Sequence, residues 1–219
     1  MKEMLRTIST EKHALEETPF ILWLGNKDIT LKEKYSFVPS MAFFIMGFKD
    51  ILMHLKSESS ETDIEKLIAQ HCEEDLGHWV WYVKDLERLG FEFSSWGEDL
   101  SSFFSRLWGN DTQECRRLVY LTMHYAQSIN DPRLLLVIIE VMEATFGAFI
   151  DALHHSSRDK QINTELEFFG LKHHDAESNH SLGSWIDGKN SSADLHNVIL
   201  SQEPREHKKN RRKTGSESN

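Results

Sequence analysis

Apolar residues along this chain recur at spacings of three and four, the period of an amphipathic α-helix, and strand-like alternation is nearly absent. Together with its capping and breaking residues, the pattern predicts helices over residues 2–17, 38–56, 62–90, 112–128, 131–155, 163–185 and 193–202. Residues 18–29 break the first helix, and residues 94–111 form a connection that has room for a short helical stretch. We therefore expect an all-α fold, a compact bundle of about seven helices.

Three local signals mark helix ends. Thr62 and Glu65 have the spacing of a capping box, in which each side chain bonds the backbone N–H of the other. Gly90 is placed where a helix commonly ends in a left-handed residue. Asp131 followed by Pro132 is typical of an N-cap and the first helical position.

Length and composition predict one helical domain over residues 1–203, since 219 residues suit a single core. Residues 204–219 are basic and polar, and we expect them to form a disordered tail. The net charge of −10 argues against a nucleic-acid binder. The two cysteines, the lack of a visible secretory signal and the short apolar runs predict a cytoplasmic protein with no membrane span.

Ionisable residues interrupt the apolar stripe of three helices at mid-length. In the helix over 62–90, the stripe changes from isoleucine and leucine to His71 and His78, which align within about 20° on one face. Glu143 takes a stripe position in the helix over 131–155, one turn after Glu140. A buried carboxylate needs a partner or a metal, because burying it alone costs several kcal/mol.

Facing helices that each place His or carboxylate groups inward are typical of a metal site inside a bundle. Imidazole and carboxylate without clustered thiolate favour iron or manganese over a structural zinc. The candidate ligands are His71, His78, Glu143, His173, Glu177 and His180, with Glu74 and Asp75 as further candidate carboxylates. The aromatic and sulfur side chains expected to wall a substrate pocket beside them are Phe44, Tyr82, Met142, Phe146 and Phe169.

The alternatives are ordinary structural roles. A single histidine is more often a core or surface group than a ligand, and Glu143 alone could pair with Arg116 or Arg133. The segment from His173 to His180 would, on that view, be a solvated helix end. The metal site is favoured because ionisable residues take positions of the apolar stripe in three separate helices.

The His173-x-x-x-Glu177-x-x-His180 motif, with Glu143 about thirty residues earlier and His78 before it, resembles the haem-oxygenase-like di-iron oxidases. This superfamily includes thiaminase II and pyrroloquinoline-quinone synthase. The segment "TPFILWLGNKDITLKEKYSF" (18–37) is similar to its opening, so the resemblance covers residues 18–185. It departs at His71, where the family usually has glutamate. Either His71 binds directly, or Glu74 or Asp75 supplies the oxygen ligand.

The resemblance implies two Fe(II) ions and O2-dependent oxidation of a small molecule, an amino acid or its derivative. Known reactions of the family include N-oxygenation, desaturation and oxidative carbon–carbon scission, and one branch turns an aromatic amino acid into a nitrile. We expect a small-molecule substrate and neither a nucleic-acid nor a membrane partner; a homodimer stays open.

Three rival functions remain. A haem oxygenase would use one N-terminal histidine, and His13 lies suitably, but the glycine-rich distal helix is missing. A thiaminase-like hydrolase without metal would need a nucleophilic cysteine, for which Cys115 near a helix start is the candidate. A non-enzymatic metal-binding helical protein is the third. A ferritin-like bundle, another di-iron fold, would need more inward glutamates than the sequence offers.

Overall fold

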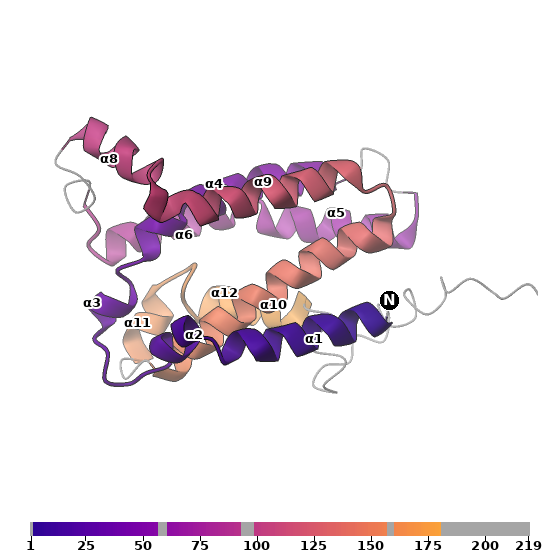
Figure 1. Ribbon diagram of the computed structural model, residues 1–219. Helices are drawn as coiled ribbons and strands as arrows, with labels where there is room; N and C mark the ends of the chain where they lie inside the picture. Colours follow the sequence, from indigo (N-terminus) through magenta and orange to yellow (C-terminus); the bar gives the residue numbers. More distant parts are fainter. Residues whose placement is uncertain (1, 57–60, 93–98, 157–159, 181–219) are drawn as a thin grey trace, which may run out of the picture.

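The computed structural model describes residues 2–56, 61–92, 99–156 and 160–180 (Figure 1). Its elements are α1 (Lys2–Glu16), α2 (Pro19–Leu24), α3 (Leu31–Lys34), η1 (Val38–Met41), α4 (Ala42–Leu55), α5 (Asp63–Asp75), α6 (His78–Arg88), α8 (Leu100–Leu107), η2 (Asn110–Thr112), α9 (Gln113–Ser128), α10 (Pro132–Ser156), α11 (Lys160–Glu165) and α12 (Leu171–His180). The described residues contain no strand, so the all-α prediction is confirmed.

The helices form two groups joined by α10. In Figure 1, α4, α5, α6 and α9 lie on one side, and α1, α2, α11 and α12 lie on the other. Helix α4 packs mainly against α9 and α5, whereas α10 contacts α1, α2, α5 and α12. Because α10 runs diagonally from one group to the other, its middle lies where the two groups meet.

The apolar interior is divided into two clusters along α10. Ile139 belongs to a cluster with residues of α4, α5 and α9, whereas Phe149 and Ile150 belong to one with residues of α2, α6 and the 166–169 segment. Glu140 and Glu143 lie between these positions and are only 3% and 7% exposed. The interruption of the stripe seen in the sequence is therefore a buried polar layer between two apolar clusters.

The predicted helix ends are confirmed where the signal is local. The Glu65 amide donates to Thr62 Oγ1 at 3.3 Å, and the Thr62 amide donates to Glu65 Oε2 at 2.8 Å. Gly90 has φ of 73°, the left-handed region that favours glycine. Helix α10 begins at Pro132 as expected.

The single helix predicted over residues 62–90 is wrong. Helix α5 ends at Asp75, and α6 begins at His78. Gly77 lies at this break, where glycine weakens a helix by about 1 kcal/mol relative to alanine.

The single helix predicted over residues 163–185 is also wrong. Helix α11 ends at Glu165, and α12 begins at Leu171. Between them, the backbone amides of Glu167, Phe168 and Phe169 donate to the carboxylate of Asp85 instead of to carbonyls of a helix. The helix predicted over 193–202 and the tail over 204–219 lie outside the described residues.

One segment, Leu31–Leu55, is long and apolar enough by length and composition to cross a membrane, although its continuous apolar runs are short. Core helices meet the same criterion. Here the segment is divided among α3, η1 and α4, and Ile45, Ile51 and Leu52 of α4 are buried.

Candidate metal centre

Three predicted candidates come together in the polar layer. His71 Nε2 lies 2.9 Å from Asp75 Oδ2 and 3.1 Å from Glu143 Oε1. All three side chains are buried, and one ligand atom from each lies within 4.8 Å of the others. One imidazole and two carboxylates at this spacing form a group that could hold a metal ion.

The two helices that meet here explain the group. His71 and Asp75 are four residues apart near the end of α5, so they share one face of that helix. Glu143 lies on α10, which packs against α5. Both Asp75 oxygens are buried, and an imidazole nitrogen lies close to each of them. Such a carboxylate has lone pairs directed at its neighbours and suits a metal ligand.

The break between α5 and α6 brings a second histidine to Asp75. His78 is the first residue of α6, and its Nδ1 lies 3.5 Å from Asp75 Oδ1. Asp75 therefore lies between His71 and His78, with one oxygen near each ring. The sequence pattern indicated Asp75 only as a further candidate carboxylate, after the six main candidate ligands.

His173 completes this side of the site from α12. Its ring centroid lies 4.2 Å from that of His78, and its Nδ1 lies 2.9 Å from the Phe168 carbonyl oxygen. A carbonyl only accepts, so Nδ1 carries a proton, and in the neutral ring Nε2 then carries the lone pair. Metal-binding histidines are commonly held in this way by a backbone carbonyl.

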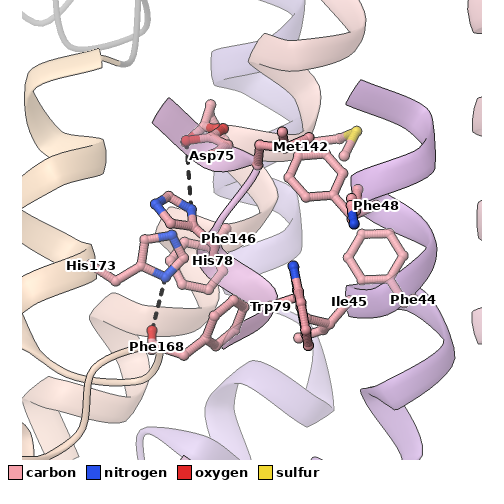
Figure 2. Close-up of a pocket in the computed structure, with 13 residues that line it drawn as sticks. Phe44, Ile45, Phe48, Asp75, His78, Trp79, Met142, Phe146, Phe168 and His173 are labelled. Carbon is pink, nitrogen blue, oxygen red and sulfur yellow. Dashed lines mark hydrogen bonds and ion pairs between the residues drawn. The ribbon is translucent and has the colours of Figure 1, made fainter. Parts of the chain in front are cut away.

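These groups line a cavity of about 60 Å³. Figure 2 shows His78 and His173 on one side of it and Phe44, Phe48 and Met142 on the other. Its lining residues are Phe44, Ile45, Phe48, Lys49, Asp75, Leu76, His78, Trp79, Met142, Glu143, Phe146, Phe168 and His173. On this measure one water molecule needs about 10–15 Å³, so the cavity has room for several small molecules beside the candidate ligands.

Neither a family model nor a curated protein matches this chain. The chemistry of the site is therefore inferred from its own residues.

The predicted pocket walls divide into two sets. Phe44, Met142 and Phe146 line the cavity. Tyr82 and Phe169 do not; both are 0% exposed and belong to the apolar cluster around α6 and the end of α10. The Tyr82 hydroxyl donates to the Val38 carbonyl at 2.8 Å, which is a structural role.

The remaining predicted ligands lie elsewhere. Glu74 is exposed and accepts a hydrogen bond from Gln70 Nε2 at 3.0 Å. Glu177 and His180 are within α12, but their side chains lie outside the described part of the chain.

Several cavity residues were missed by sequence reasoning, notably Lys49, Trp79 and Phe168. Trp79 follows His78 directly, and that neighbourhood was the only available signal. The sequence gives no sign that Lys49 or Phe168 lines a cavity. Lys49 looks like an ordinary polar residue of a helix, and Phe168 belongs to a short apolar run of a common kind.

Two carboxylates control the charge of His71. Burial lowers the pKa of this imidazole, but Asp75 and Glu143 outweigh that effect and raise the pKa to about 11. Without metal, the group therefore holds an imidazolium between two carboxylates. Burial, assisted by Asp75, raises the pKa of the adjacent Cys72 thiol to about 12, so the thiol is protonated.

Metal binding at His71 should release a proton. At pH 8 an ordinary histidine is neutral, since its pKa is about 6.5, whereas His71 in the metal-free protein keeps its proton. A metal ion takes the neutral imidazole, so we expect about one proton released per Co(II) bound at pH 8. The apparent affinity should rise about tenfold per pH unit up to pH 9.

Calorimetric titrations in buffers with different ionisation enthalpies measure this release. His71→Gln, whose amide does not titrate, is the control and should release no proton. Tight Co(II) binding by the unchanged protein without proton release would show that His71 is not a ligand.

Proposed function

We propose that this protein is a non-haem di-iron oxidase or oxygenase that uses O2 to oxidise a small molecule. The observation that supports this most is the buried group of His71, Asp75 and Glu143, which adjoins an apolar cavity that also holds His78 and His173. The motif resemblance to the haem-oxygenase-like di-iron oxidases agrees with this donor set.

On this proposal the candidate ligands would be shared between two metal ions. His71, Asp75 and Glu143 would hold one, and His78 and His173, with Glu177 and His180 from the same helix, would hold the other. Asp75 has an oxygen near the histidine of each set. Two Fe(II) ions would supply electrons for the reduction of O2.

The protein's contribution is a small cavity with a mainly apolar lining. Phe44, Phe48 and Phe146 present apolar walls, which favour an apolar gas over water. Aromatic and aliphatic walls also protect a reactive oxygen species from solvent.

The positive charge of Lys49 favours a substrate that carries a negative charge. It is the only lysine or arginine among the described residues that line the cavity, and its Nζ lies 5.7 Å from the centre of the Trp79 ring. A substrate carboxylate would pair with this ammonium while its apolar part packs on Trp79. This combination suits an amino acid or amino-acid derivative. The proposed reactions are N-oxygenation, desaturation or carbon–carbon scission, including nitrile formation from an aromatic amino acid.

The rival functions find less support. Burial raises the pKa of the Cys115 thiol, and this cysteine does not line the cavity, so a thiolate nucleophile is disfavoured. His13 is exposed and bonds the Ser9 carbonyl of its own helix at 2.7 Å, which offers no haem site. A metal-binding protein without activity differs from an oxidase only in its reaction with O2.

The test is anaerobic loading with Fe(II), followed by measurement of O2 uptake with a series of amino acids and their amides. We expect close to two Fe(II) per chain and faster O2 uptake with one or more acids than with the matching amides. Binding of a single Zn(II) in preference to iron, or of no metal, would contradict the di-iron proposal. Iron without substrate-dependent O2 uptake across the series would favour the non-enzymatic alternative.

A further inference from the structure

We propose that Asp85 is a positioning residue for the candidate ligand His173, acting through the Leu166–Gly170 turn between α11 and α12. The proposal rests on the proposed metal function. Sequence reasoning did not single out Asp85, and this residue does not line the cavity.

The carboxylate of Asp85 binds three successive backbone amides of this turn. Oδ1 accepts from the Glu167 amide at 2.8 Å, and Oδ2 accepts from the Phe168 and Phe169 amides at 2.8 and 3.0 Å. The Asp85 side chain is 0% exposed, and its Oδ1 also pairs with Arg88 Nη1 at 3.2 Å. Successive N–H groups around one anion form a backbone nest, and such charge-assisted bonds are about twice as strong as neutral ones.

One peptide unit connects Asp85 to the metal site. The Phe169 amide donates to Asp85, and the Phe168 carbonyl of the same peptide accepts from His173 Nδ1 at 2.9 Å (Figure 2). In a trans peptide the N–H and C=O groups point in opposite directions. By holding the N–H, Asp85 therefore directs the carbonyl toward His173.

The direction of this carbonyl sets the state of the His173 ring. With Nδ1–H bonded to the carbonyl, Nε2 keeps its lone pair for a metal ion. A carbonyl whose own peptide N–H is bonded to a carboxylate is also a stronger acceptor. His154 Nε2 holds the next carbonyl, that of Phe169, at 2.8 Å, so the turn is fixed from α6 and from α10.

The experiment compares Asp85→Asn with Glu167→Gln. The asparagine keeps the shape but has only one acceptor oxygen and no charge, so at least one of the three amides loses its acceptor and the remaining bonds are weakened. Glu167→Gln is the same kind of chemical change within the turn, but the Glu167 side chain contacts Lys84, Arg88 and Lys172 instead of the Phe168–Phe169 peptide. Asp85→Glu, which keeps the charge but displaces it, serves as a second variant and should show an intermediate effect.

Two measurements are made on each variant. The first uses ¹⁵N-histidine NMR of the metal-free protein to determine the tautomer of His173. Asp85→Asn should mix the two tautomers, whereas Glu167→Gln should keep the Nδ1–H form. The second is Co(II) titration, in which Asp85→Asn should weaken one of the two sites by about 10- to 100-fold, the usual effect of losing an outer-shell partner. The site of His71, Asp75 and Glu143 should keep its affinity.

A destabilised control separates positioning from general loss of stability. Ile51→Ala opens the other apolar cluster, in which Ile51 is 0% exposed, and should leave the His173 tautomer unchanged. An unchanged tautomer in both Asp85→Asn and Asp85→Glu, or an equal tautomer change in Ile51→Ala, would overturn the proposal. Should the unchanged protein bind no metal, the proposed function fails, while the tautomer measurement still tests the link from Asp85 to His173.

Discussion

Asp75→Asn should lower metal affinity more than any other single change, because Asp75 has one oxygen near His71 and the other near His78. Replacing an outer-shell partner typically costs 10- to 100-fold in affinity, so we expect a loss of at least about 100-fold here, at both proposed ions. Competition titrations with Co(II), or iron analysis after anaerobic loading, measure the effect.

Glu74→Gln is the matched control. Glu74 precedes Asp75 directly but is exposed and bonds Gln70, so this variant should bind metal as the unchanged protein does. The pair of variants decides which carboxylate of this helix is the ligand. Loss of metal in Glu74→Gln, with full binding in Asp75→Asn, would show that the arrangement described here is wrong.

Phe169→Ala should cost more stability than truncation of the predicted aromatic residues that line the cavity. Its side chain is 0% exposed, with ring centroids of Phe168 and Tyr35 at 5.0 and 5.8 Å. Truncating a fully buried phenylalanine typically costs about 3–5 kcal/mol of unfolding free energy, because a cavity remains. Urea unfolding of the metal-free protein measures this cost.

Phe146→Ala provides the comparison, since Phe146 is half-buried and lines the existing cavity. It should lose less stability than Phe169→Ala, because the cavity that it enlarges is already present. It should instead change which substrates support O2 uptake. Equal stability losses in the two variants would contradict the division between wall and core residues.

Much of the fold was predictable because its signals are local. The capping box of Thr62 and Glu65 joins residues three apart, and Gly90 ends α6 through its own backbone angle. The apolar stripes also predict burial correctly, since side chains three and four apart share a helix face. For the same reason, the interrupted stripes located the polar layer that contains His71 and Glu143.

The arrangement inside that layer depends on the tertiary structure. Asp75 became central only because α5 ends there and α6 restarts at His78, a break that the apolar pattern crosses without a change of period. Tyr82 and Phe169 are aromatic residues of the kind that line pockets, yet helix packing places them in the core.

The sequence by itself determined the helical class, the helix ends with local caps and the set of ionisable residues that interrupt the core, because each depends on residues within about one or two turns. Only the tertiary structure decided which of these residues meet and what orients them. Asp85 accepts hydrogen bonds from three backbone amides that are 82 to 84 positions later in the sequence. His71 and Glu143 are 72 positions apart. Contacts across such separations leave no periodic trace in the sequence, because packing of whole helices brings the partners together.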